Sequence, residues 1–241
     1  MSTTTGPGRL CNQVIRNLAL SVMAKKHNLY VRHYNMVNPI EELGIILFNG
    51  TNKFRTSQEI TTENYTDHYN KKTMDYNCCC SEFYQSEACS DIIYKHLQSE
   101  DQLASIKNKN PFKDRYDNNN DLFIHIRLGD VPQFNPGVDY YINCIKRVSF
   151  DKLYIASDDF HDKKIVKRIQ SLYPDTIFVD KSPVQTIQFG STCKHIILSH
   201  GSFSAVIGYL SVDSHVYYSH KEPGWCPLGM FTNKSWHATN K

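Results

Sequence analysis

The chain has 241 residues, of which 40% are hydrophobic and 21% charged, a composition that is ordinary for one large globular domain or two small ones. Its formal net charge of +3 is too small for a nucleic-acid-binding protein, which carries a concentrated basic face. No apolar run approaches the ~18 residues of a membrane span. Residues 1–10 lack the basic and apolar regions of a signal peptide, so we expect a cytoplasmic protein.

Eight cysteines occur, at positions 11, 78, 79, 80, 89, 144, 193 and 226. None of them forms a C-x-x-C pair, which argues against a structural zinc site. Because no signal peptide is visible, reduced thiols are the default expectation. A disulfide framework is the alternative, and a Cys80–Cys89 bond would be its best candidate.

The chain opens with a pattern that is typical of an α/β unit. A Gly6-Pro7-Gly8 turn precedes apolar residues at every fourth position from Leu10 to Val22, which predicts a helix capped by Asn12. Residues 28–34 indicate a strand. The strand expected before Gly6 would have to come from residues 1–5.

The middle of the chain is less regular. Residues 39–48 predict a helix or a helix-to-strand passage, and residues 49–90 predict loops and short strands. Helical spacing returns over residues 90–107. The polar segment 108–121 is the candidate linker between two domains.

From residue 122 onward, strands and helices alternate, which predicts a parallel sheet with crossover helices. The predicted strands are residues 122–126, 152–156, 176–179, 196–199 and 215–218. The predicted helices lie around residues 140–148, 161–173, 184–193 and 203–210.

Three polar segments follow predicted strands of this sheet. They are residues 125–130 (HIRLGD), 157–159 (SDD) and 199–204 (SHGSFS). The carboxyl ends of parallel strands share one edge of the sheet, and ligands of open α/β sheets bind beyond that edge. The shared edge is therefore a stronger indication of a site than any one segment.

Arg127 offers a planar fork of donors that suits a diphosphate. The alternative is an ion pair with Asp130 or Asp158. His125 is two residues before Arg127, which places both on the same face of a strand. A hydrogen-bonded core histidine is the alternative for His125.

Small residues at positions 199–204 stand where a helix begins, and free backbone N–H groups at such a point suit a phosphate. The hydroxyls of Ser202 and Ser204 would add donors. A plain serine cap, worth about 1 kcal/mol, is the alternative. Asp158 and Asp159 either cap the following helix or bind substrate, and their D-D pattern differs from the D-x-D of metal-bridged sugar-nucleotide sites.

These motifs, in this order, resemble those of the fucosyltransferases that form α-1,2 linkages, and more loosely the superfamily that includes α-1,6- and protein O-fucosyltransferases. Residues 8–13 (GRLCNQ) match the family's G-x-L-G-N-Q except at Cys11. Residues 125–130 match H-x-R-R-G-D except at Leu128, and residues 157–159 match S-D-D. Residues 193–204 are similar to C-x-H-x-I-x-S-N-S-S-F-S, and Pro223-Gly224-Trp225 with Trp236 to the family's closing motifs. The resemblance covers the chain except roughly residues 35–110.

The resemblance implies a GT-B-like α/β fold with two Rossmann-like domains facing across a donor and acceptor cleft. Residues 1–112 would form the acceptor-side domain, and residues 113–241 the domain that binds the nucleotide sugar. It further implies an inverting, metal-independent enzyme that transfers fucose from GDP-fucose to a glycan, at O2 of galactose. No cofactor beyond the donor substrate is expected.

The same resemblance implies roles for single residues. His125 contacts the guanine, and Arg127 binds the β-phosphate with help from Ser202 or Ser204. Asp130 and Asp158 brace the site, and Asp130 is also the candidate general base. The remaining donor-binding residues are Gly8, Asn12, Gln13 and Phe203.

The chain departs from the family pattern at three places. Leu128 replaces an arginine, Gln185-Thr186 stands where an acidic guanine-binding residue is common, and Ala205-Val206 replaces a bulky aromatic pair. Another GDP-hexose, such as GDP-rhamnose or GDP-mannose, is therefore an alternative donor. A non-catalytic module that binds a glycan or a nucleotide sugar is the alternative to an enzyme.

Overall fold

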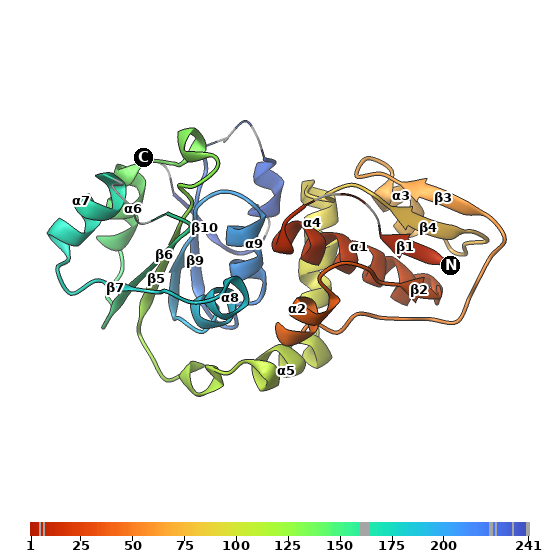
Figure 1. Cartoon of the computed structure of the whole chain (residues 1–241), viewed down its shortest axis with the longest axis horizontal. Helices are drawn as coiled ribbons and strands as arrows, with labels where there is room; N and C mark the ends of the chain where they lie inside the picture. Colours follow the sequence, from red (N-terminus) through yellow and green to blue (C-terminus); the bar gives the residue numbers. More distant parts are fainter. Residues whose placement is uncertain are drawn as a thin grey trace. The chain divides into compact units, whose positions relative to one another are not determined.

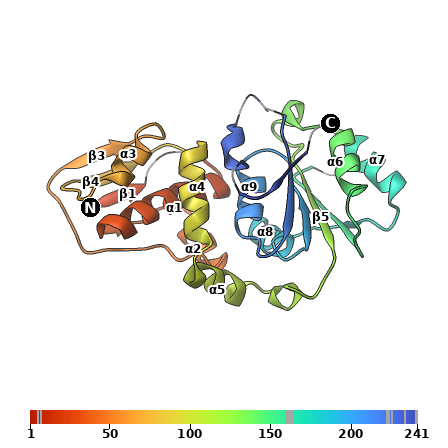
Figure 2. The same ribbon diagram turned by 180° about the vertical axis from the view of Figure 1, so that it is seen from behind.

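The computed structural model describes residues 1–4, 6, 8–159, 164–221, 224, 226–232 and 234–239. The chain divides into two compact units, Met1–Lys109 (unit 1) and Asn110–Lys241 (unit 2), drawn in Figures 1 and 2. Each unit is built on a parallel sheet with helices between its strands. The boundary falls inside the polar segment 108–121 that the sequence indicates as a linker. The acceptor-side and donor-side roles of the units stay predictions.

Unit 1 has a four-stranded sheet in the order β2-β1-β4-β3. Its strands are β1 (Ser2–Thr4), β2 (Val31–Arg32), β3 (Ser57–Ile60) and β4 (Asn77–Cys80). Its helices are α1 (Leu10–His27), α2 (Val37–Glu42), α3 (Tyr65–Asn70), α4 (Glu87–Leu97) and α5 (Glu100–Lys109). The short strand β1 therefore precedes Gly6, as the turn–helix–strand pattern requires.

Helix α1 confirms the apolar spacing from Leu10 to Val22, and most of its residues are buried. The predicted cap is wrong, because Arg9 occupies the cap position and Asn12 lies inside the helix. Asn28 ends the helix in the left-handed conformation, with a φ of 52°. The strand predicted over residues 28–34 therefore begins later, because Asn28 belongs to this turn, and β2 is only Val31–Arg32.

The single helix predicted over residues 90–107 is two helices. The first, α4, ends at Leu97, and the backbone N–H of Leu103 bonds the carbonyl of Ser99 to open α5. Glu100 and Asp101 stand in the first turn of α5, where acidic side chains favour a helix start. Periodicity alone did not show this break because both helices keep apolar residues on a buried face.

Unit 2 has a six-stranded parallel sheet in the order β10-β9-β8-β5-β6-β7. Its strands are β5 (Leu122–Ile126), β6 (Leu153–Ser157), β7 (Ile177–Phe178), β8 (His195–Ile197), β9 (His215–Ser219) and β10 (His237–Thr239). Its helices are α6 (Val138–Ile145), α7 (Lys164–Leu172), α8 (Pro183–Gly190) and α9 (Ser202–Tyr209). The predicted strands and helices of this half are present, and β10 is an addition. The first residues of the helix predicted over 161–173 lie outside the described residues.

The strand β5 alternates between two helical layers. In both views α6 and α7 lie on one side of the unit 2 sheet and α8 and α9 on the other (Figures 1 and 2). Leu122, Ile124 and Ile126 belong to the apolar core with residues of α6 and α7. Phe123 contacts Phe189 of α8, and His125 bonds Ser204 of α9. Because of this period of two, His125, the polar residue of β5, faces the α8–α9 side.

The cysteines and helices settle two further expectations. All eight cysteines are free thiols, so the Cys80–Cys89 bond is not formed. Burial raises the pKa of Cys80 to about 12 and that of Cys89 to about 11, which leaves both thiols protonated and unreactive at neutral pH. Among the described residues, no helix combines the length and the apolar character needed to cross a membrane.

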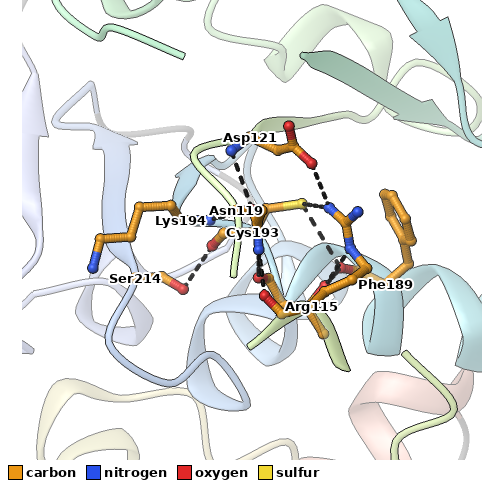
Figure 3. Close-up of polar contacts among 8 residues, drawn as sticks. Arg115, Asn119, Asp121, Phe189, Cys193, Lys194 and Ser214 are labelled. Atoms are coloured by element: carbon orange, nitrogen blue, oxygen red, sulfur yellow. Dashed lines mark hydrogen bonds and ion pairs between the residues drawn. The ribbon is translucent and has the colours of Figure 1, made fainter. Parts of the chain in front are cut away.

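The segment 110–121 belongs to unit 2 and bonds residues that lie just before β8 (Figure 3). Arg115 pairs with Asp121 (Nη2 to Oδ2, 2.8 Å) and donates to the Thr192 hydroxyl (3.1 Å) and the Cys193 sulfur (3.4 Å). Asn119 bonds the carbonyl of Thr192 and accepts from the backbone N–H of Lys194. These contacts tie the entry of β5 to the entry of β8.

We expect Arg115→Met to destabilise unit 2, because Asp121 is only 5% exposed and would keep an unpaired charge. Breaking a buried ion pair costs about 3–5 kcal/mol, and partial exposure of Arg115 reduces this to about 2 kcal/mol. Both tryptophans, at 225 and 236, belong to unit 2, so tryptophan fluorescence during urea unfolding reports on this unit. The control Lys152→Met removes an exposed side chain and should change stability by less than about 0.5 kcal/mol. Equal effects of the two variants would contradict the assignment.

Candidate functional site

The candidate site lies at the carboxyl edge of the unit 2 sheet. The strands β8, β5 and β6 are direct neighbours and parallel. The three polar segments 125–130, 157–159 and 199–204 follow these strands, so the structure brings them to one edge as the sequence predicts. The fold therefore places these three segments next to one another.

Arg127 stands one residue beyond β5 and forms a two-point ion pair with Asp130. Its Nε lies 3.0 Å from Oδ1, and its Nη2 lies 2.9 Å from Oδ2. The side chain of Arg127 is 16% exposed and that of Asp130 is 36% exposed. A bidentate pair of this kind fixes the plane of the guanidinium. The ion-pair alternative for Arg127 is therefore real, and it uses two of the five guanidinium N–H donors.

Asp158 forms hydrogen bonds with the turn that follows Arg127. Its Oδ1 accepts hydrogen bonds from the backbone N–H groups of Leu128 (2.6 Å) and Gly129 (2.9 Å). A side chain at position 129 would bring a Cβ within 2.8 Å of Asp158 Oδ2, so the close approach needs glycine here. Asp158 thus acts across strands, from the end of β6 onto the end of β5. The start of the helix that Asp158 or Asp159 was expected to cap lies outside the described residues.

Asn135 holds the same turn from the other side. Its Nδ2 donates to the carbonyl of Arg127 (3.1 Å) and to the hydroxyl of Tyr141 (2.9 Å). Its Oδ1 accepts from the backbone N–H of Gly137, just before α6. Sequence reasoning missed this residue. Its only signal is an asparagine before Pro136-Gly137, which is a common turn pattern.

His125 is a buried, hydrogen-bonded histidine, as its alternative interpretation states. It is 5% exposed, its Nδ1 lies 2.6 Å from the Ser204 hydroxyl, and its ring contacts Phe203. Burial lowers the pKa of His125 to about 4, so the ring is neutral at physiological pH. Ser204 is fully buried and engaged with His125. Ser202 and Phe203 are half-buried at the start of α9.

The start of α9 has the features of an anion-binding end. The cap residue is Gly201, with a φ of 96°, which supplies no side-chain hydrogen bond to the first backbone N–H groups. The alternative of a serine cap is therefore wrong. The first turn of α9 has no acidic residue. Unsatisfied N–H groups and the positive end of the helix dipole favour a negative charge at this point.

The opening motif belongs to unit 1 and follows β1. The Nε2 of Gln13 lies 3.2 Å from the Gly6 carbonyl and 3.3 Å from the Gly8 carbonyl, so this buried side chain holds the turn together. Gly8 has a φ of 132°, which favours glycine. Asn12 accepts a hydrogen bond from Gln85 (3.0 Å). The guanidinium of buried Arg16 also bonds the Gly6 carbonyl (2.9 Å).

The three departures from the family pattern have different surroundings. Leu128 is 3% exposed and part of the core beneath α6 and α7. Ala205 and Val206 are buried within α9, and Thr186 is buried within α8. Gln185 is exposed near the start of α8. The position where the family has a second arginine therefore lies in the apolar core of this chain.

The site holds acidic groups but no metal-binding cluster within the described ranges, where no three His, Cys, Asp or Glu side chains have the necessary geometry. Metal independence itself stays a prediction. In the closing motif, Pro223 and Trp225 lie outside the described residues. Trp236 contacts Tyr209 of α9 and Phe231.

Comparisons with known proteins give a match to structures only. No protein-family model and no curated protein sequence matches the chain. The solved fucosyltransferase NodZ from Bradyrhizobium is similar over 87% of this chain and 93% of its own, with a TM-score of 0.51 and 10% identity. A selenomethionine form of the same protein gives the same TM-score and identity, over 91% of its chain. The heptosyltransferase WaaC from E. coli, bound to ADP-2-deoxy-2-fluoro heptose, has a TM-score of 0.49 and 8% identity over 99% of this chain.

The likeness to NodZ shows the fold. Two α/β units, each with a parallel sheet, make up the GT-B fold. This is the fold that the resemblance in sequence implies for this chain.

The stability of unit 2 should fall as the pH drops from about 6.5 to about 4. Unfolded His125 takes up a proton near its ordinary pKa of 6.5, whereas the folded residue does so only near 4. The unfolded state then binds more protons, so stability falls with falling pH, by up to about 3 kcal/mol for this residue. Urea unfolding followed by tryptophan fluorescence from pH 7 to pH 4 measures the dependence. In His125→Asn the slope should decrease by about one proton; an unchanged slope would show that His125 is not the group involved.

Proposed function

We propose that the chain is an inverting glycosyltransferase that transfers fucose from GDP-fucose to a glycan hydroxyl, at O2 of galactose. The observation that carries the proposal is the pairing of Arg127 with the N-terminus of α9. They follow the neighbouring strands β5 and β8, so a fixed cation and a set of backbone N–H groups share one sheet edge. That combination suits a diphosphate.

The proposed chemistry explains why such groups would matter. When the bond between the sugar and GDP breaks, negative charge develops on the β-phosphate oxygen. A preorganised arginine and a helix N-terminus stabilise that charge more in the transition state than in the bound substrate. Because Asp130 fixes the guanidinium plane, Arg127 needs little reorganisation when the charge appears.

The geometry supports different roles for the other predicted donor-binding residues. His125 and Ser204 bond one another, so we assign them to the positioning of α9 on β5. Asp158 positions the backbone after Arg127. Ser202 and Phe203, which are partly exposed at the start of α9, are assigned to direct contact with the donor.

We assign the acceptor-side role to unit 1 and a substrate-binding role to its motif at residues 8–13. Gln13 bonds the carbonyls of Gly6 and Gly8, and Asn12 accepts from Gln85. These bonds support a positioning role for Gln13. Asn12 is partly exposed and stays a candidate for direct contact with substrate.

Two lines support fucose as the donor sugar. The motifs of the chain resemble those of α-1,2-fucosyltransferases, and the NodZ protein that shares its fold is a fucosyltransferase. The decisive assay offers the protein GDP-fucose, GDP-mannose and GDP-rhamnose with galactosides in EDTA, and measures GDP release. Turnover only with another GDP-sugar would overturn the fucose assignment. Tight GDP binding without turnover on any acceptor would indicate a binding module.

Arg127→Ala should reduce kcat/KM by roughly 10²–10³, the usual effect of losing one preorganised donor to developing charge. The matched control is Arg168→Ala, which removes an exposed arginine from α7 and should leave kcat/KM unchanged. The two rates are compared with the same GDP-sugar. An Arg127→Ala enzyme as active as the parent would sink the mechanistic proposal.

Asp130→Asn separates the two roles proposed for Asp130. Both of its oxygens bond Arg127, which supports an orienting role over proton abstraction. We therefore expect a higher KM for the donor and a pH–rate profile that keeps the shape of the parent's. A general base would instead give a fall in kcat of roughly 10²–10⁴ and the loss of the acidic limb of the profile.

A further inference from the structure

His200 is a buried polar side chain at the carboxyl edge of the unit 2 sheet, and the proposed site gives it no role. It follows β8 and comes directly before Gly201, the cap residue of α9. It is 4% exposed, and its Nε2 has no hydrogen-bond partner among the described residues. The family motif has an asparagine at this position.

The surroundings of His200 combine an aromatic ring with a nearby positive charge. Its ring packs edge-on against Phe231, with centroids 6.4 Å apart. Burial, together with the positive charge of Lys221, lowers the pKa of His200 to about 4. Lys221 follows β9, the neighbour of β8, so it lies beyond the same sheet edge. The imidazole is therefore neutral and stands in a positive environment.

A buried polar atom without a partner is unfavourable, and folded proteins satisfy more than about 90% of such groups. Exceptions call for an explanation, and a bound ligand that supplies the partner is one. A neutral imidazole that carries its proton on Nε2 can donate one hydrogen bond. The N–H groups at the start of α9 and the charge of Lys221 favour an anionic acceptor for that bond.

We propose that His200 is a further donor-binding residue, whose Nε2 hydrogen-bonds a phosphate oxygen of the bound GDP-sugar. The assignment rests on the proposed transferase function, because it takes the diphosphate to lie at the start of α9. It also gives the site a donor after β8 that is separate from Arg127 after β5.

The test is the affinity for GDP of His200→Phe, measured by isothermal titration calorimetry. The substitution keeps an aromatic ring but removes the donor, so GDP should bind roughly 10- to 100-fold more weakly, as expected for a hydrogen bond to a charged group. Guanosine, which lacks phosphates, should bind both proteins equally. The unfolding free energy should not fall, since the variant removes a buried polar atom that has no partner.

Two further variants complete the test. His200→Gln keeps an N–H donor at similar reach and should recover most of the GDP affinity, and it substitutes for the phenylalanine variant if that one fails to fold. The matched control is His195→Phe at the opposite end of β8, where the ring bonds Asn120. This control should lose stability and keep the affinity of the parent for GDP.

Three results would overturn the proposal. Equal GDP affinity of His200→Phe and the parent would make His200 an internal packing residue. An equal loss of guanosine affinity would place the contact on the base and not on the phosphate. If the parent itself does not bind GDP, the proposed function fails together with this inference, whereas the first two results leave that function standing.

Discussion

The hydrogen bond between His125 and Ser204 is the interaction on which the rest of the candidate site depends. It joins the central strand β5 to helix α9, and both side chains are almost fully buried. Because burial keeps His125 neutral, the bond forms without a buried charge. The two groups proposed to bind a diphosphate, Arg127 and the N-terminus of α9, lie at the ends of the two elements that it connects. A shift of α9 along β5 would move one relative to the other, so the bond sets the geometry of the anion site.

Within each unit, most motif residues hold nearby backbone or side chains in place. Asp158 and Asn135 fix the backbone on either side of Arg127, and Asp130 fixes its side chain. Gln13 does the same for the turn at Gly6 and Gly8. The groups assigned to direct contact with a ligand are fewer, and they include a partly exposed guanidinium, the first residues of α9, Asn12 and His200. Such a division is expected where catalysis relies on preorganised electrostatics, since the supporting residues must outnumber the groups that they position.

The sequence was most informative where periodicity and burial coincide. The alternation of strands and helices after Leu122 predicts unit 2 well, because each parallel strand is a short apolar run that ends in a polar turn. It could not predict that Asn12 lies within α1, or that Ser99 separates two helices, because such ends depend on local backbone geometry. Asn135 and His200 were missed for a different reason. The carbonyl that Asn135 bonds approaches its side chain only in the folded chain, and only the fold shows that Nε2 of His200 is buried without a partner among the described residues.

Leu128, which stands where the family has an arginine, shows how the fold limits the charge of the site. Ile126 and Leu128 are two residues apart and belong to the same core beneath α6 and α7. Asp158 fixes the backbone N–H of Leu128, so the side chain cannot turn to the α9 side without losing that bond. A cation at this position would stand in an apolar layer, where an unpaired charge is strongly unfavourable. Among the described residues, Arg127 after β5, the start of α9 after β8 and Lys221 after β9 supply positive charge at the sheet edge, a distribution centred on β8.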